Sequence, residues 1–390
     1  MDKKFVMGIA AMAALTLVSC SSDDLDSFSD NSSKNEAISF DGYLGRSAVA
    51  VNGTRGSVQD KTTLRSAGFG VFGKYTDGQT SDANFFKNQP VTCPGTKWTY
   101  SPLKYWPTQG KIDFFAYAPY KEGQTLKGNT NTFDFTVEPK AADQIDLLWA
   151  NATGKITENF EGTTKKKVNF LFKHALSRLG YTVKLSGNYS PDNATFTLKK
   201  ITLAGSPDET KEAFYKTGTI DLSKTDTKEN LSMTNKPTGL WTAATDNNKQ
   251  NFTWFDASYV VNSTDSKHPT NSANEDYSAK DYLFVIPQNF SEKIEEAGQQ
   301  KENPDKLYVI VEYNVTYKSE SGTPATTITN KVYKKLPIKF EQGKAYMLNL
   351  TIGLPIEFDI DVETVSGVEP WEEVNGVPGK IDSWDDIESK

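Results

Sequence analysis

The side chains that most often carry out chemistry are scarce in this chain of 390 residues, which has two cysteines and two histidines. Cys93 stands alone in its region, and His174 and His268 lie far from it in the sequence. The usual zinc sites and a Cys/His nucleophilic pair need more members than this. His174, between Phe172 and Leu176, fits a structural histidine on a half-buried strand better than a catalytic one. The sequence therefore predicts neither a metal site nor a catalytic residue.

Carboxylates and glycines are abundant, but their spacing does not favour an enzyme. Asp359 and Asp361 would share one face of a strand, and a solvated strand surface explains them better than a glycosidase pair. Gly68, Gly70 and Gly73 fall inside a strand pattern instead of opening a helix, so they do not form a phosphate cradle. The chain is therefore predicted to be no enzyme and to hold no cofactor.

Four aromatic residues could stack against sugar rings, namely Trp98, Tyr100, Tyr105 and Trp106. They are interleaved with prolines and precede a strand that is expected to be buried. This context favours packing in the core or between domains over an exposed platform. Glycan binding at the cell surface is kept as the alternative function.

The cysteine whose spacing does indicate chemistry is Cys20. Lys3 and Lys4 precede an apolar run, residues 5–18, that is too short to span a bilayer and has the form of a signal peptide. The run leads into Leu-Val-Ser-Cys, which resembles the bacterial lipobox, where the cysteine sulfur receives a diacylglycerol before cleavage. We expect residues 1–19 to be removed and Cys20 to carry the lipid. An ordinary secretory signal with an incidental cysteine is the alternative.

Residues 20–36 are rich in Ser, Asp and Asn, so they cannot bury enough apolar surface to fold and should form a flexible tether. The Ser-Ser-Asp-Asp run at 21–24 resembles the export signal of surface lipoproteins in Bacteroidota, although a plain acidic linker would look the same. The net charge of −7 and the lack of a basic stripe argue against binding to nucleic acid. With Cys20 acylated, no intramolecular disulfide can form, and stability must come from packing.

Apolar and polar residues alternate with a period of two through most of the chain, and no segment keeps a helical period for three turns. The sequence therefore predicts an all-β protein. Strands are expected at 69–75, 112–117 and 133–137, near 168, and at 181–185, 196–201, 282–286, 308–317, 333–340 and 346–352.

A polar stretch at 152–167 is the expected linker between two β-sandwich domains, which we place at 56–164 and 165–371. Residues 223–280 are expected to form an elaborated loop region. The Glu/Gln/Lys-rich stretch 291–306 should be a solvated insertion, and it is the one place where a short surface helix fits.

Several short motifs occur in a particular order. They are Trp98-Thr99-Tyr100-Ser101-Pro102, Lys104-Tyr105-Trp106-Pro107, Ile112 to Pro119, Asp146-Leu147-Leu148-Trp149-Ala150, Phe172 to Ser177, Ile286-Pro287-Gln288 and Gly343-Lys344-Ala345-Tyr346. Behind a lipobox, this ordered set resembles the fimbrillin family, the Mfa-like subunits of type V pili in Bacteroidota. The resemblance implies two tandem transthyretin-like, Greek-key β-sandwich domains. It also implies a structural subunit of a cell-surface fimbria that serves adhesion, without catalysis or a cofactor.

The same resemblance implies export as a lipoprotein to the exposed face of the cell outer membrane, cleavage by an Arg-specific protease, and polymerisation with other pilus subunits by donor-strand exchange. Arg55, in a Gly/Asn/Thr-rich segment, is the expected cleavage site and would make Gly56 the first mature residue. Arg46 is the second candidate and Arg65 the third. The acidic tail 372–390 departs from the simplest shaft pattern, so the position of the subunit in a fibre, as shaft, tip or anchor, stays open.

The segment expected to be removed, residues 37–55, contains a possible edge strand. Ile38, Phe40 and Leu44 would bury one apolar row against a sheet, and their removal would leave unpaired backbone groups and an apolar groove.

A second alternating segment near the carboxyl end could fill such a groove. Ile356, Phe358, Ile360 and Val362 point one way from a strand whose other side is acidic. We expect residues 355–365 to be the donor strand. The alternative is that they form the last strand of their own domain.

Overall fold

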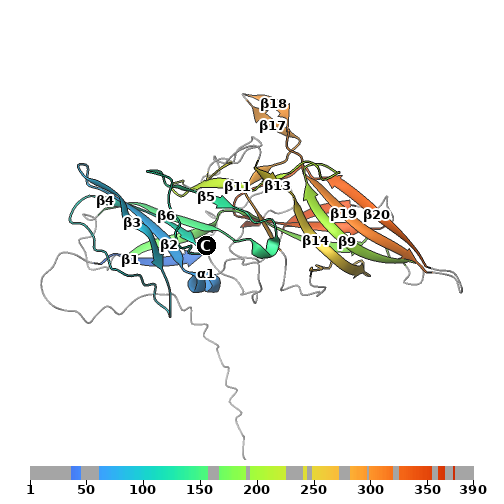
Figure 1. Cartoon of the computed structure of the whole chain (residues 1–390), viewed down its shortest axis with the longest axis horizontal. Coiled ribbons are helices and arrows are strands. Elements are labelled where there is room, and N and C mark those ends of the chain that lie inside the picture. Colours follow the sequence, from blue (N-terminus) through green and yellow to red (C-terminus); the bar gives the residue numbers. More distant parts are fainter. Residues whose placement is uncertain are drawn as a thin grey trace, which may run out of the picture.

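The computed structural model describes residues 37–44, 61–156, 167–189, 194–224, 240–243, 248–271, 282–296, 298–318, 325–353, 359–364 and 372–373. In these residues the regular secondary structure is almost wholly β-strand, so the predicted all-β class is confirmed. Two β-rich blocks follow each other along the long axis of the molecule (Figure 1).

The first block is a six-stranded sheet in the order β1-β7-β6-β4-β2-β3. Its strands are β1 (Ser39–Leu44), β2 (Phe69–Thr76), β3 (Ser81–Val91), β4 (Lys111–Ala118), β6 (Leu148–Ile156) and β7 (Lys167–His174). β1 runs parallel to β7, whereas the other neighbouring strands are antiparallel. The sheet curls until its two edge strands meet, because the rings of Phe40 on β1 and Phe86 on β3 lie 5.3 Å apart.

Both faces of the central strand β4 are buried, which explains its dense aromatic pattern. Ile112 and Phe114 face the interior of the curled sheet, which we call the first core, while Phe115 and Tyr117 face the second block. Successive residues of a strand point to opposite faces. The strand predicted at 112–117 is therefore confirmed, and its two apolar rows belong to two different cores.

The second block is a sandwich of two sheets, in the orders β14-β9-β19-β20 and β15-β8-β22-β23. The strands of the former are β14 (Phe252–Val261), β9 (Ala194–Ala204), β19 (Tyr308–Tyr317) and β20 (Thr326–Lys335), and those of the latter are β15 (Leu283–Val285), β8 (Ser177–Leu185), β22 (Lys344–Ile352) and β23 (Asp359–Thr364). β24 (Glu372–Glu373) also pairs with β22.

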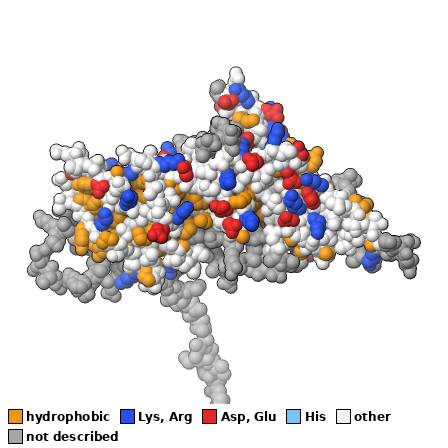
Figure 2. All heavy atoms as spheres, in the orientation of Figure 1, with side chains coloured by type: hydrophobic (Ala, Val, Ile, Leu, Met, Phe, Trp, Pro, Cys, Tyr) orange, Lys and Arg blue, Asp and Glu red, His pale blue; other side chains and the backbone are white. Residues whose placement is uncertain are grey.

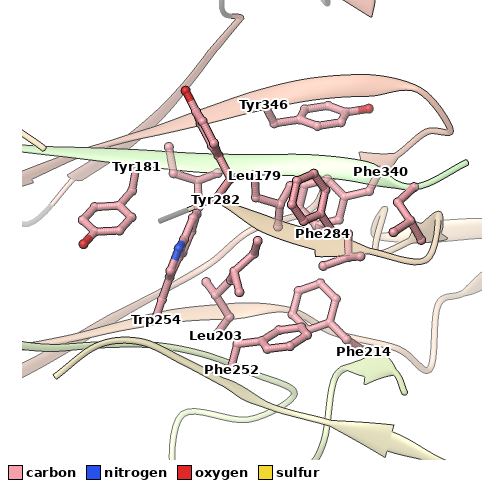
Figure 3. Close-up of a cluster of buried hydrophobic side chains, with 14 of the residues drawn as sticks. Leu179, Tyr181, Leu203, Phe214, Phe252, Trp254, Tyr282, Phe284, Phe340 and Tyr346 are labelled. Carbon is pink, nitrogen blue, oxygen red and sulfur yellow. The ribbon is translucent and has the colours of Figure 1, made fainter. Parts of the chain in front are cut away.

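The second core lies between these two sheets. Figure 3 shows Leu179 and Tyr181 of one sheet facing Leu203 and Trp254 of the other, and the rings of Tyr181 and Trp254 lie 4.8 Å apart. All four side chains are at most 1% exposed. The second core therefore has the interdigitated packing of a sandwich interior.

A small sheet joins the two blocks. It contains β5 (Thr132–Thr136), β11 (Thr217–Asp221) and β12 (Trp241–Ala243) in the order β12-β11-β5. Phe133 of β5 belongs to the same buried cluster as Ile220 and Trp241. The second core thus continues into the junction between the blocks.

The remaining elements are short. Two more two-stranded ladders pair β10 (Phe214–Tyr215) with β13 (Lys249–Gln250) and β16 (Gln288–Asn289) with β21 (Lys339–Phe340). A 3₁₀ turn, η1, covers Ala141–Asp143, and one short helix, α1, covers Lys61–Ala67. The sequence did not predict α1, because a helix of seven residues whose buried side chain is Leu64 shows too little helical period to be recognised.

The stretch 291–306 forms a β-hairpin, so the short surface helix considered there is wrong. β17 (Lys293–Glu296) pairs with β18 (Gln299–Glu302), and the hairpin projects from the molecule (Figure 1). Gly298, with φ of +75°, adopts the left-handed conformation that tight hairpin turns need. Ile294 is buried and anchors the base.

The expected loop region at 223–280 contains a core strand, so that expectation is corrected. β14 carries the buried side chains Phe252 and Trp254 and pairs with β9. Two irregularities, between Thr253 and Phe255 and between Asp256 and Tyr259, shift its register. These bulges interrupt the period of two and concealed the strand in the sequence.

Two other strand boundaries differ from the expectations. β6 extends to Ile156, inside the expected linker, and β7 follows at Lys167 as part of the first sheet. The first sheet therefore continues past the proposed domain division at 164. In addition, the strand expected at 333–340 is divided between β20 and β21.

Charged side chains gather over the second block and the β17–β18 hairpin in the view of Figure 2, while more apolar side chains are visible over the first block. Within the described residues, no helix is long and apolar enough to cross a membrane.

Candidate functional site

The first strand, β1, is an edge strand held on both sides. Along one side it pairs with β7 over its whole length. On the other side, the loop that follows β3 holds its beginning: the Ile38 N–H donates to the Lys104 carbonyl at 2.8 Å, and Ala37 pairs with Tyr105 in an isolated bridge. The strand thus fills a slot between β7 and this loop.

The inward side chains of β1, together with Ile38 directly before it, complete the first core. Ile38, Phe40 and Leu44 are 1%, 4% and 7% exposed. The Phe40 ring is surrounded by four others at centroid distances of 5.2 to 5.8 Å, those of Phe86, Tyr100, Phe114 and Phe170. We call the space that β1 occupies the β1 groove. Without the strand, these rings would line an open apolar groove.

Tyr100 holds the start of the strand through its backbone. Its hydroxyl donates to the Ile38 carbonyl at 2.7 Å and accepts from the Lys104 N–H at 3.2 Å. Burial raises the pKa of Tyr100, so the hydroxyl remains a donor at neutral pH. Sequence reasoning treated Tyr100 only as a core or sugar-stacking aromatic, because nothing local indicates a partner 62 residues away.

The four aromatic residues considered as a sugar platform are mostly packed inward. The Trp98 ring lies 4.8 Å from that of Phe69, and Trp106, which is 7% exposed, packs edge-on against Phe114. Tyr105 is 51% exposed. The set therefore presents one accessible ring instead of a flat stacking surface, and core packing is the better interpretation.

The connection that follows β1 contains the two preferred cleavage candidates. β1 ends at Leu44 and α1 begins at Lys61; Arg46 and Arg55 lie between them, outside the described residues. A cut at either would separate β1 from the chain that follows and leave it held by hydrogen bonds and packing. Arg65 lies inside α1, where a helical backbone hinders a protease, so the structure disfavours this candidate.

Of the expected donor strand, Ile360 and Val362 are described, whereas Cys20, Ile356 and Phe358 lie outside the described residues. β23 pairs with β22 at the edge of its own sheet, with Ile360 opposite Leu350. Ile360 is 8% exposed and belongs to the second core. In this structure β23 thus has the position that the sequence analysis gave as its alternative.

The acidic side of β23 faces solvent, as the strand pattern predicts. Asp359 and Asp361 are both exposed. Lys334 of β20 hydrogen-bonds to Asp359, which lowers the pKa of that carboxyl and links the edges of the two facing sheets. The two aspartates therefore form part of a solvated strand face.

Both histidines make structural contacts. His174 Nδ1 lies 2.8 Å from Asp146 Oδ1 in a fully buried pair at the end of β7. His268 Nδ1 bonds to the Tyr181 carbonyl. Within the part of the chain that the structure describes, no three His, Cys, Asp or Glu side chains are grouped as a metal site would need.

The fold is that of bacterial fimbrial proteins. A fimbrial protein from Bacteroides vulgatus ATCC 8482 has a TM-score of 0.53 with this chain at 20% sequence identity, and the match covers 84% of this chain and 98% of that one. The chain belongs to the fimbrillin-like family, whose profile matches residues 54–371, so the resemblance seen in the motifs is confirmed. The fimbrium subunit Fim1C of Phocaeicola vulgatus (strain ATCC 8482) is 28% identical over 397 residues, which cover 93% of this chain and 95% of that protein.

Proposed function

We propose that this protein is a fimbrial subunit that polymerises by donor-strand exchange, with the β1 groove as the acceptor. The observation that carries the proposal is the position of β1. It buries three apolar side chains at the edge of the first core and is followed directly by the segment that contains Arg46 and Arg55. The family match begins at residue 54, after β1 and next to Arg55, which supports a mature unit that starts at Gly56.

The energetics favour replacement of β1 over an empty groove. Burial of Ile38, Phe40 and Leu44 stabilises the precursor by roughly 5–9 kcal/mol, at about 1.5–3 kcal/mol for each large side chain. Loss of the strand would expose this surface and the backbone groups of β7. A strand from a neighbouring subunit restores both kinds of interaction, as in other cases of strand addition to a sheet edge.

The proposed donor is the segment 355–365. Its described part, β23, is an edge strand with one neighbour, β22, over its whole length. An edge strand can leave a sheet without breaking a second ladder. For β23 to act as donor, Ile360 must exchange its place in the second core for a place in the β1 groove of the next subunit.

Export completes the proposal. Cys20 carries the lipid, residues 20–36 tether the precursor to the outer face of the outer membrane, and an Arg-specific protease releases the subunit for assembly. One acyl chain alone binds a membrane only marginally. A lipoprotein carries several acyl chains on its cysteine, and together these would hold the precursor in the membrane.

The test is treatment of the purified precursor with an Arg-specific protease, followed by electrophoresis in SDS without boiling. We expect a ladder of multimers that collapses on heating. Arg55→Ala combined with Arg46→Ala should abolish the ladder, whereas the matched variants Arg46→Ala and Arg65→Ala should retain it. Complete cleavage at Arg55 without multimers would contradict the proposal, and fibres whose subunits begin at Cys20 would identify an unprocessed anchor instead.

A further inference from the structure

One inward position of β1 has no side chain. Gly42 lies between Phe40 and Leu44 in the inward row, and a Cβ atom added there would lie 3.0 Å from Phe69 Cε1, 3.3 Å from Phe172 Cε2 and 3.5 Å from Trp98 Cζ2. The first two distances are shorter than the separation of about 3.5–4.0 Å at which carbon atoms attract each other. The β1 groove is therefore shallower under Gly42, because these aromatic rings occupy the space that a side chain would need.

The rings that occupy this space support one another. Phe69 is fully buried, and its ring centroid lies 4.8 Å from that of Trp98 and 5.2 Å from that of Phe172. A further ring, Phe170, packs against it at 5.8 Å. Because protein cores are close-packed, a ring in such a cluster can yield little space. We call Phe69, Trp98 and Phe172 the aromatic step.

We propose that the aromatic step selects the strand that occupies the β1 groove by requiring glycine at the third of its four inward positions. The inference rests on the proposed function and adds the chemistry of the partner. The preferred occupant is a strand of a fimbrial subunit with large apolar, large apolar, glycine and large apolar residues at alternate positions, as Ile38, Phe40, Gly42 and Leu44 have in β1.

The proposed donor of this chain does not meet this requirement. In the direction and register of β1, Phe358 takes the place of Phe40, and Ile360 falls on the aromatic step. Any other register, in either direction, that buries at least three of the four apolar donor residues also puts one of them there, since all four alternate without a gap. Self-assembly through this donor must therefore displace the step, and a donor with glycine there binds more tightly.

The step itself is tested in the intact precursor, without strand exchange. Alanine usually stabilises a strand relative to glycine where there is space. We expect Gly42→Ala to lower the thermal midpoint by about 3–5 °C instead, and Ser39→Ala, at an outward position of β1, to change it little. Trp98→Ala should reduce the effect of Gly42→Ala in a double-mutant cycle, because it lets the Phe69 ring move. A raised or unchanged midpoint for Gly42→Ala would overturn the proposal.

Selection is tested with peptides on the cleaved protein after the released segment has been removed. A fluorescent peptide of residues 37–44 should bind, and its Gly42→Val form should bind at least about tenfold more weakly. A peptide of residues 355–365 should gain about tenfold in affinity from Ile360→Gly, although this change removes apolar surface. Weaker binding of that variant would overturn the proposal. If even the 37–44 peptide fails to bind, the proposed strand exchange is wrong. The thermal midpoints of the intact precursor would then still test the aromatic step independently.

Discussion

Phe40 contributes most to the packing of β1 against the first core, because its ring contacts four other aromatic rings there. We expect Phe40→Ala to lower the free energy of unfolding by about 3–5 kcal/mol, the usual effect of removing a buried phenylalanine. Denaturant unfolding of the precursor measures it. Tyr43→Ala, on the opposite and exposed face of the same strand, is the control and should cost about 1 kcal/mol or less. Equal losses would contradict the assigned core contacts.

The Tyr100 hydroxyl should slow the departure of β1 after cleavage. Tyr100→Phe removes the bond to the Ile38 carbonyl, worth about 1 kcal/mol, so the cut strand should dissociate about fivefold faster. Because burial raises the pKa of Tyr100 above 10.0, its stabilising contribution is fully present below about pH 10 and is lost as the pH rises through the raised value. Stopped-flow fluorescence of labelled β1 measures the rate, with Tyr105→Phe as control. Identical rates in Tyr100→Phe and the unaltered protein would contradict this role.

Asp77 should make the turn between β2 and β3 sensitive to acid. The backbone N–H of Thr80, the Thr80 hydroxyl and the backbone N–H of Gln79 all donate to its carboxylate, which holds the pKa of Asp77 well below its usual 3.8. The stability that Asp77 contributes is thus present above pH 3.8 and is lost as the pH falls through the lower folded value.

Thermal midpoints measured as a function of pH check this assignment. Asp77→Asn should lower the midpoint at neutral pH, and the difference from the unaltered protein should shrink as the pH falls below about 4. A difference that does not change with pH would show that the carboxylate charge is irrelevant to the turn. Asp82→Asn, on the exposed start of β3, is the matched control.

For single residues, the sequence predicted which side chains face the core wherever apolar and polar residues alternate. The inward row of Ile38, Phe40 and Leu44 could be read directly, because period two assigns each residue of a strand to a face. The role of Tyr100 and the aromatic step under Gly42 could not be predicted from the sequence, since both depend on residues that are distant in the chain. Their partners meet only when the sheet curls and closes on itself.

Among the elements, β1 and β23 are both edge strands that bury one row of side chains, and only β1 has candidate cleavage sites beside it. Regular strands such as β19 were predicted with their observed ends. β14 was missed because its bulges break the period, and the β17–β18 hairpin was missed because its composition is that of a solvated helix. The Glu/Gln/Lys-rich composition thus led to the wrong prediction, whereas Gly298 at the turn was the residue that indicated a hairpin.

Truncation of the chain distinguishes the two interpretations of β23, as a donor strand or as the last strand of its own domain. If the segment 355–365 is the donor, a chain that ends at Leu354 should fold as a monomer and fail to extend fibres after cleavage, because nothing enters the next groove. Phe358→Asp combined with Ile360→Asp should act in the same way. Circular dichroism and the SDS ladder together measure the outcome. Loss of folding would make β23 an indispensable strand of its own sheet, and undiminished polymerisation would place the donor elsewhere.

For the whole molecule, the two blocks act as one folded unit, because the second core extends through Phe115 and Trp149 of the first sheet. The sequence predicted two domains but could not predict this shared core, since both faces of β4 look equally apolar. Family membership places the chain among the subunits of cell-surface fimbriae.

We propose that membrane attachment depends on Cys20. Cys20→Ala should release the precursor from the outer membrane in soluble form, because the acyl chains are its only proposed anchor. Fractionation and immunoblotting measure the distribution, and Cys93→Ala is the control. A Cys20→Ala protein that stays in the membrane fraction would contradict lipidation at this residue.

Hydrogen exchange along β7 tests the central claim most directly, since β7 is the strand that β1 covers. Those backbone amides of residues 167–172 that point toward β1 should be protected in the precursor, exchange rapidly once the protein has been cleaved and the released segment removed, and regain protection in the polymer. Amides that stay protected without β1, or that remain unprotected in assembled fibres, would show that no strand is exchanged at this site.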